Sequence, residues 1–109
     1  MLMLYVVLLR YIRSLAEVEA HLEAHRDYLY RQFGAGRFIA SGPQEPRQGG
    51  VILARAPSRE ALLGWLAEDP FSQAGVAAFE VVAFHATLRA SELPASLAPD
   101  SAAVPRLAA

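Results

Sequence analysis

The sequence predicts an α+β domain with a ferredoxin-like arrangement, in which strand, helix, strand, strand, helix and strand follow one another and form an antiparallel sheet. Three observations predict this fold. The chain of 109 residues has the length of one domain, and its hydrophobic fraction of 54% is sufficient to build a core. Short apolar runs typical of strands alternate with two stretches in which apolar residues recur every three or four positions, as in helices. Glycine, proline and helix-capping residues stand where these elements should begin and end.

The first strand is expected over residues 2–10, which are rich in Val, Leu and Tyr. A helix should follow from Ser14, because Ser14 and Glu17 have the spacing of a capping box. The apolar stripe of this helix has steps of three and four: Leu15, Val18, Leu22, His25, Leu29 and Phe33. Residues 34–36, Gly-Ala-Gly, end the helix because they tolerate a left-handed C-cap.

A β-hairpin is expected next, with strands over residues 37–41 and 51–55 and a polar loop over residues 45–50. Ser58 is a good N-cap for a second helix. The apolar stripe of that helix comprises Leu62, Trp65 and Leu66.

The second helix should stop at Asp69 and Pro70, with Asp69 as the N-cap and Pro70 as the first residue of a short further turn. The last strand is expected over residues 79–88. The folded domain therefore occupies residues 1–89. Residues 90–109 differ in composition, because thirteen of these twenty are Ala, Pro or Ser without periodicity, and they are expected to form a loose tail.

The predicted sheet has apolar residues on both faces. In this arrangement both helices cover one face, and the other face should alternate polar with apolar residues. The first strand is apolar in both registers, with Leu4, Val6 and Leu8 on one face and Tyr5, Val7 and Leu9 on the other. We therefore expect a second copy of the chain to cover the free face, in a homodimer that packs sheet against sheet.

Composition excludes several classes of function. Ten arginines against eleven carboxylates give a formal charge of −1, so a nucleic-acid partner is not expected. The chain has no cysteine and no lysine, which excludes thiol nucleophiles, zinc fingers and Schiff-base chemistry. The apolar run at the N-terminus is shorter than the ~20 residues that span a bilayer, and no positive charge precedes it, so we expect a cytoplasmic protein without membrane attachment.

Acid–base chemistry is therefore expected mainly from the three histidines and the carboxylates. His25 lies within the apolar stripe of the first helix, so its imidazole should point at the sheet. A nearby carboxylate could tune such a histidine for proton transfer, and Asp69 is the candidate for that carboxylate. The alternative interpretations are a core histidine satisfied by one hydrogen bond and an aspartate that only caps a helix turn.

The other two histidines give weaker signals. His21 precedes His25 by four residues, a spacing at which two histidines can share a metal, but no glutamate directly follows His21 and no third ligand is evident. We expect no metal and no other cofactor. His85, in the last strand, is more simply explained as a tolerated strand residue than as part of a cavity.

Two further residues are candidates for substrate binding. Ser41 closes the second strand before a Gly-Pro turn and could bind a substrate oxygen. Arg10, at the end of the first strand, could meet an anionic ligand at the mouth of a pocket.

These residues, taken together, resemble the YCII-related (YciI-like) family. The resemblance extends over about residues 1–89 and depends on the order of several short motifs: His25, Gly36-Arg37-Phe38, Ser41-Gly42-Pro43, Gly49-Gly50, Asp69-Pro70-Phe71 and Ala74-Gly75-Val76. It implies a ferredoxin-like fold that dimerises into an α/β barrel, similar to muconolactone isomerases. It also implies an active site built from a histidine and an aspartate, which correspond to His25 and Asp69. One member of the family removes chloride from a chlorinated hydroxyquinol.

Two functions follow from these observations. The first is a small enzyme without cofactor, of lyase or isomerase type, in which His25 and Asp69 move a proton on a small cyclic or aromatic compound. The second is a non-catalytic module that binds a small ligand or only dimerises, with the same two residues as a structural pair. The two functions predict different surroundings for His25, which should lie on the wall of an open pocket in the enzyme.

Overall fold

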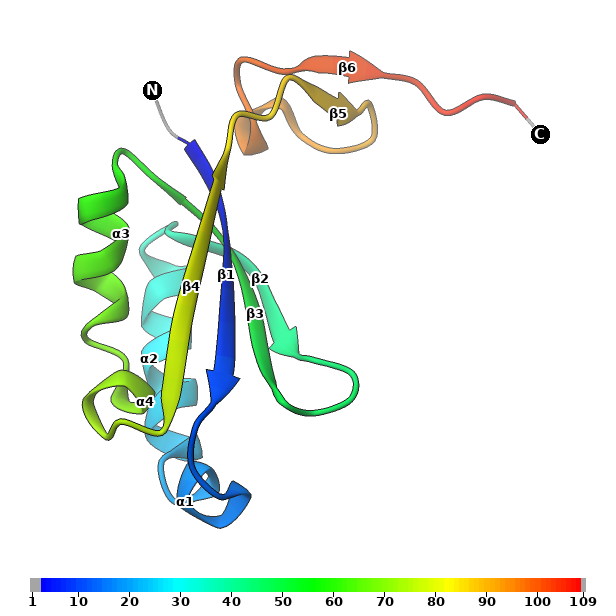
Figure 1. Cartoon of the computed structure of the whole chain (residues 1–109). Helices are drawn as coiled ribbons and strands as arrows, with labels where there is room; N and C mark the ends of the chain where they lie inside the picture. Colours follow the sequence, from blue (N-terminus) through cyan, green and yellow to red (C-terminus); the bar gives the residue numbers. More distant parts are fainter. Residues whose placement is uncertain (1–2, 109) are drawn as a thin grey trace.

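A computed structural model describes residues 3–108, and Leu2 of the expected first strand lies outside these residues. Four antiparallel strands form one sheet in the order β2-β3-β1-β4, and the helices cover one of its faces (Figure 1). The strands are β1 (Met3–Tyr11), β2 (Phe38–Pro43), β3 (Gly49–Ala56) and β4 (Ala77–Phe84). This α+β architecture is the ferredoxin-like fold that the sequence predicts.

The first predicted helix is divided into two. Ser14 caps α1 (Leu15–Glu19) by accepting a hydrogen bond from the Glu17 amide at 3.2 Å. The chain turns at residues 20–21 and continues as α2 (Leu22–Gly34). The prediction of one continuous helix from Ser14 to residue 34 is therefore wrong, because two helices occupy this stretch.

The side chains that α1 and α2 bury differ in part from the predicted stripe. Leu15 and Phe33, which the predicted stripe includes, are 47% and 37% exposed. Tyr28 and Gln32 are buried in their place, together with His25. The buried residues Val18, His25, Tyr28 and Gln32 are spaced by seven, three and four positions, so the buried stripe keeps helical spacing across the turn. In the second half of α2 it lies one residue before the predicted positions Leu29 and Phe33.

The caps of the other helices agree with the sequence prediction. The Ser58 hydroxyl accepts a hydrogen bond from the Ala61 amide at 3.1 Å and starts α3 (Arg59–Leu66). Asp69 caps α4 (Pro70–Gln73), with the proline at the first position. Gly36, with a φ of 75°, provides the left-handed residue after α2.

The core lies between the sheet and the helices. Tyr5, Val7 and Leu9 of β1 point into it, at most 3% exposed. The helices contribute the other large buried side chains: Val18, Tyr28, Leu62, Leu66 and Phe71. Alternation along β1 thus assigns its odd-numbered residues to the helix-covered face.

The β2–β3 hairpin is fixed against β1 at Gly49. A Cβ atom at this position would lie 1.7 Å from the Leu9 carbonyl oxygen, so only glycine fits. This close approach anchors the start of β3 beside the end of β1. The loop of residues 44–48 is thereby held at the same end of the sheet as α4 (Figure 1).

The other face of the sheet carries no helix and is mainly apolar. Alternation places Leu8 on this face, and its paired neighbours there are Val51 of β3 and Glu80 of β4. Val82 and Phe84 of β4 lie on the same face and are 47% and 41% exposed. We call this surface the open face; its apolar members are Val6, Leu8, Val51, Leu53, Val82 and Phe84. Leu4, at one end of the same face, is buried and lines a small pocket with Leu97 and Ala98 of the C-terminal segment.

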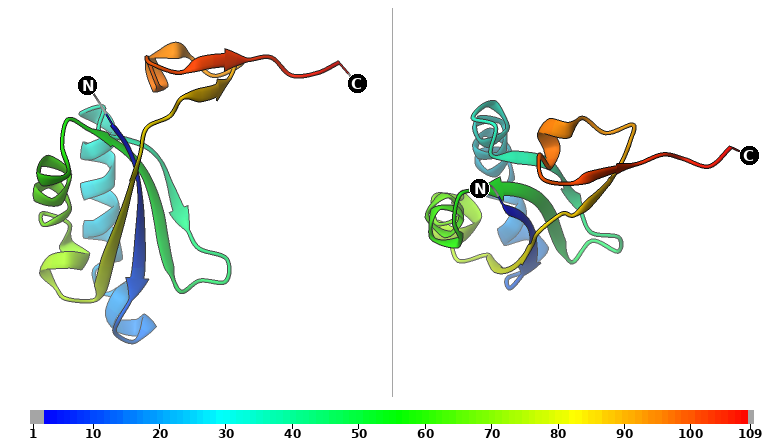
Figure 2. Two further views of the ribbon diagram at one scale, coloured as in Figure 1. Left: turned by 45° about the horizontal axis from the view of Figure 1, so that its top comes forward. Right: turned by 90° about the horizontal axis from the view of Figure 1, so that it is seen from above.

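Residues 86–108 form an arm beyond the sheet, on the side away from the helices (Figures 1 and 2). Instead of the expected loose tail, the arm contains β5 (Leu88–Ala90) paired in parallel with β6 (Ala102–Val104), and a 3₁₀ turn, Ala95–Leu97. Arg89 donates a hydrogen bond to the Ser101 carbonyl at 2.8 Å, which ties the two strands together. Small residues allow this tight pairing but supply no helical or strand periodicity from which it could be predicted.

Candidate functional site

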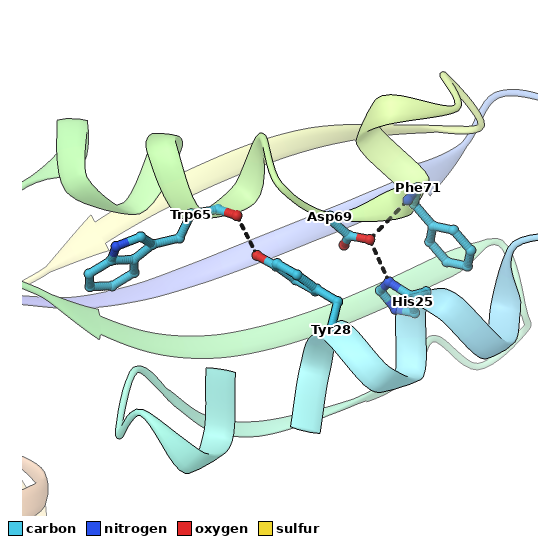
Figure 3. A network of polar contacts seen from close by, with 5 residues as sticks. All are labelled: His25, Tyr28, Trp65, Asp69 and Phe71. Atoms are coloured by element: carbon cyan, nitrogen blue, oxygen red, sulfur yellow. Dashed lines mark hydrogen bonds and ion pairs between the residues drawn. The ribbon is translucent and has the colours of Figure 1, made fainter. Parts of the chain in front are cut away.

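Two helices bring His25 and Asp69 together in the interior. His25 lies one turn into α2, and Asp69 immediately precedes α4. His25 Nδ1 and Asp69 Oδ1 are 2.8 Å apart, although the residues are 44 positions apart in sequence (Figure 3). His25 is 8% exposed and Asp69 is fully buried.

The Asp69 carboxylate has two roles through one oxygen. Oδ1 accepts hydrogen bonds from His25 Nδ1 and from the Phe71 amide, the latter at 2.9 Å. Oδ2 is buried and has no hydrogen-bond partner within residues 3–108. Because a carboxylate oxygen accepts, we assign the proton of the neutral imidazole to Nδ1, which leaves the lone pair on Nε2.

The plane of the imidazole is fixed by an aromatic side chain. The rings of His25 and Phe71 are parallel within 5°, with their centroids 3.9 Å apart. Phe71 is itself 2% exposed, so it forms a rigid base for the imidazole. Hydrogen bonding at Nδ1 and stacking together set the direction of Nε2.

Tyr28 stabilises the helix layer beside this pair. Its hydroxyl donates a hydrogen bond to the Trp65 carbonyl oxygen and links α2 to α3 (Figure 3). Burial, followed by the negative charges of Asp69 and Glu68, raises the pKa of the Tyr28 phenol well above its ordinary value. The folded protein therefore retains a neutral Tyr28 at pH values at which an unfolded chain would ionise it.

Replacing Tyr28 with phenylalanine should lower the free energy of unfolding by about 1 kcal/mol at neutral pH, because the Trp65 carbonyl loses its donor. The raised pKa means that the Tyr28 contribution to stability is complete below the unfolded pKa of 10.0 and falls as the pH rises above it. Stability should therefore fall less between about pH 9 and about pH 11 in Tyr28→Phe than in the wild type. Urea unfolding at neutral pH measures the first effect, and urea unfolding across the alkaline range measures the second. Equal losses of stability with rising pH in the two proteins would contradict the assignment.

A pocket opens beside His25, between α2 and the β2–β3 hairpin. Its volume is about 280 Å³, and His25 forms part of its wall. The deeper wall is apolar and is formed by Leu9, Leu22, Leu29, Ile52 and Phe71. Asp69 does not line the pocket but lies behind His25, so the histidine separates the carboxylate from any occupant.

The two residues expected to bind substrate have different positions. Ser41 lines the pocket, on the helix-facing side of β2 where it pairs with Ile52. Arg10 does not line it. Its pairing with Gly49 and Ala78 places Arg10 in the same alternation as Leu8, on the open face.

Two arginines that the sequence pattern does not single out line the pocket instead. Arg26 follows His25 on α2, and Arg47 comes from the β2–β3 loop. Arg47 Cζ lies 5.8 Å from the centre of the Tyr11 ring. Interaction with Tyr11, and to a smaller extent with Glu19, raises the pKa of the Arg47 guanidinium above its usual value. The sequence offers one signal for each arginine: Arg26 is next to His25, and Arg47 is the single arginine of a loop that ends in two glycines. Both signals are equally typical of ordinary surface residues, so neither identifies a residue of the pocket.

The remaining histidines lie away from the pair. His21 is the N-cap residue of α2 without a side-chain capping bond, and His85 is exposed just beyond β4. In the part of the chain that the structure describes, no three His, Cys, Asp or Glu side chains converge as metal ligands. No helix of residues 3–108 has the length and apolar character needed to cross a membrane.

Comparisons with known proteins agree with this fold. The family model for the YCII-related domain matches residues 3–85, which leaves the arm outside the match. A similar solved structure is 5-chloro-2-hydroxyhydroquinone dehydrochlorinase (TftG) from Burkholderia phenoliruptrix AC1100, in complex with 2,5-dihydroxybenzoquinone. The two chains are 21% identical with a TM-score of 0.64, over 77% of this chain and 95% of the dehydrochlorinase. Among curated proteins no match is found.

Proposed function

Because the chain belongs to the YCII-related family, we propose that it is an enzyme that transfers a proton on a small cyclic or aromatic molecule, with His25 as acid–base and Asp69 as its positioning residue. The reaction class is that of a lyase or an isomerase. The dehydrochlorinase that shares the fold is a lyase acting on a small aromatic compound, which supports this class. The roles proposed for His25 and Asp69 are supported by the active site that the family resemblance implies and by the contact between the two side chains.

One observation carries the proposal: a buried carboxylate holds Nδ1 of a histidine that forms the wall of a pocket. A histidine that is only structural would be expected with both nitrogens satisfied in the interior. Within residues 3–108, Nε2 of His25 forms no hydrogen bond. The arrangement resembles the acid–base pairs in which a carboxylate fixes the tautomer and stabilises the imidazolium.

The proposed step uses the lone pair of Nε2. This nitrogen removes the proton from an acidic C–H or O–H bond of the substrate, and the electron pair of that bond moves toward a substrate oxygen or toward a leaving group. The positive charge that forms on His25 is stabilised by the charge of Asp69. In an isomerase Nε2–H returns the proton to another substrate atom, and in a lyase it releases the proton to solvent while the leaving group departs with its electron pair.

Ser41 is proposed to bind a substrate oxygen. It lines the same pocket as His25 from the opposite wall, and its hydroxyl can donate to an oxygen that gains negative charge. Arg10 is not included in this proposal, because the structure places it on the other face of the sheet.

The reaction class can be tested without knowledge of the natural substrate. Small cyclic compounds that can enolise are incubated with the protein in D₂O, and proton NMR follows the exchange of their acidic C–H bonds for C–D. A parallel assay offers 5-chloro-2-hydroxyhydroquinone and measures chloride release. Exchange or elimination above the rate of a His25→Ala protein supports the proposal. Equal rates in the two proteins would leave His25 as a structural residue.

We also propose that two copies associate through the open face. Val82 and Phe84 leave an apolar surface exposed on this face, next to Val6 and Leu8, and no helix of residues 3–108 covers it. A two-fold dimer buries the same surface of both copies, so this single face would be sufficient. The YCII family match supports this proposal through the dimeric barrel that the family resemblance implies.

Replacing Val82 with arginine should weaken this dimer by at least about 100-fold, since the two-fold axis brings two unpaired charges into the interface. Sedimentation velocity over a range of concentrations measures the change. Leu63→Arg is the matched control, because Leu63 is 44% exposed on α3, on the opposite layer. A wild-type chain that is monomeric at all concentrations, or equal effects of the two variants, would contradict the proposal.

A further inference from the structure

The candidate pocket carries an excess of positive charge. Arg26 and Arg47 line it together with His25, whereas no Asp or Glu of the described chain does so. The chain as a whole has a formal charge of −1, so this local excess does not follow from composition. A concave site lined by charges of one sign concentrates molecules of the opposite sign.

The two guanidinium groups belong to the outer part of the pocket. Arg26 and Arg47 are both exposed, whereas His25 and Phe71 in the deeper wall are buried. The two arginines come from different elements, α2 and the β2–β3 loop, so an entering molecule passes between those elements. Their charges thus act at the entrance rather than beside Nε2.

These positive charges are only partly balanced. Arg47 Nη1 lies 3.2 Å from Glu19 Oε1, and this contact together with the Tyr11 ring holds the guanidinium in place. Arg26 forms no ion pair and no side-chain hydrogen bond with any residue from 3 to 108. One carboxylate therefore faces two guanidinium groups.

The size and character of the interior limit the rest of the ligand. An apolar protein cavity of roughly 150 Å³ admits a benzene molecule. The present pocket, at about 280 Å³, is therefore large enough for one ring with a few substituents. Its apolar side chains and the face of Phe71 favour a flat hydrophobic body.

We propose that the pocket selects a small organic acid: a single ring that carries one carboxylate or acidic enol, with the anionic group held by Arg26 and Arg47 and the ring directed toward His25. Guanidinium groups present paired N–H donors that fit such oxyanions. This inference rests on the proposed function for the claim that the acid is the substrate. The binding preference itself requires no chemistry at His25.

Benzoate and benzamide provide a matched pair of probes, because they share size and ring and differ in charge. Isothermal titration calorimetry at low ionic strength should show benzoate binding at least about tenfold more tightly than benzamide, since hydrogen bonds to charged groups carry about 1.5–3 kcal/mol and 1.4 kcal/mol is a factor of ten. The preference should decrease as salt is added, because both arginines are accessible to solvent.

Variants connect the preference to the two arginines. Arg26→Gln and Arg47→Gln should each reduce the preference for benzoate, and the double variant should abolish it. Arg31→Gln is the matched control, because Arg31 is exposed on the same helix and does not line the pocket. Circular dichroism verifies that each variant is folded.

The outcomes are distinct. Equal affinity for benzoate and benzamide, absence of binding for both probes, or an equal loss in Arg31→Gln would overturn the proposal. His25→Ala should retain a preference for benzoate, because the arginines remain. If the protein prefers benzoate but His25→Ala exchanges protons at the wild-type rate, only the proposed function is refuted. If proton exchange depends on His25 but the wild-type protein shows no preference for benzoate, only the anion site is refuted.

Discussion

Replacing His25 with alanine is expected to lower the rate of proton transfer by about 10²–10⁴-fold, which is the usual contribution of a positioned general acid or base. The reason is geometric: within residues 3–108, no other ring nitrogen lines the pocket with a carboxylate behind it. Deuterium exchange and chloride release, measured on the compounds described above, provide the rate.

His21→Ala is the matched control for this variant. His21 is the residue immediately before α2, and its side chain forms no capping hydrogen bond. It does not line the pocket. Its replacement should change the rate by less than about twofold, since surface substitutions away from a site have small effects. Loss of activity in both variants would indicate a general effect on α2 rather than chemistry at His25.

Replacing Asp69 with alanine is expected to lower the free energy of unfolding by about 2–4 kcal/mol. The Phe71 amide and His25 Nδ1–H would both lose their acceptor, and α4 would lose its cap. For a domain of this size the melting temperature should fall by about 10–20 °C. Differential scanning calorimetry and urea unfolding measure the two quantities.

Asp69→Asn separates the structural role of the residue from its charge. The amide oxygen can still accept from the Phe71 amide and from His25, so most of the stability should return. The rate should remain low, because no negative charge stabilises the imidazolium. Full activity in a stable Asp69→Asn protein would show that the charge of Asp69 has no part in the reaction.

The fold could be predicted from the sequence because its local signals agree with one another. Ser14, Ser58 and Asp69 mark three helix starts, and all three accept the expected backbone hydrogen bonds. The break between α1 and α2 could not be predicted. It occurs at Ala20 and His21, without glycine or proline, and the apolar spacing on both sides is compatible with one continuous helix.

The prediction for Arg10 failed for a different reason. Alternation along β1 defines two sets of residues, but both sets are apolar, so the pattern alone does not say which set the helices cover. The structure shows that the odd-numbered set is covered, and Arg10 belongs to the other. Ser41 lines the pocket because the register of β2 places it on the helix-covered face, and His25 lines it because of its position on the buried side of α2. Residue type alone would not place either one there.

The shared acceptor of Asp69 has a consequence for how this chain can change over evolutionary time. One oxygen atom accepts from both the backbone of α4 and the ring of His25, so selection for folding alone is sufficient to keep the aspartate. A descendant that abandoned proton transfer would still be expected to retain Asp69, whereas His25 would be released to vary. Among relatives, the identity of the residue at position 25 is therefore the better marker of whether the chemistry persists.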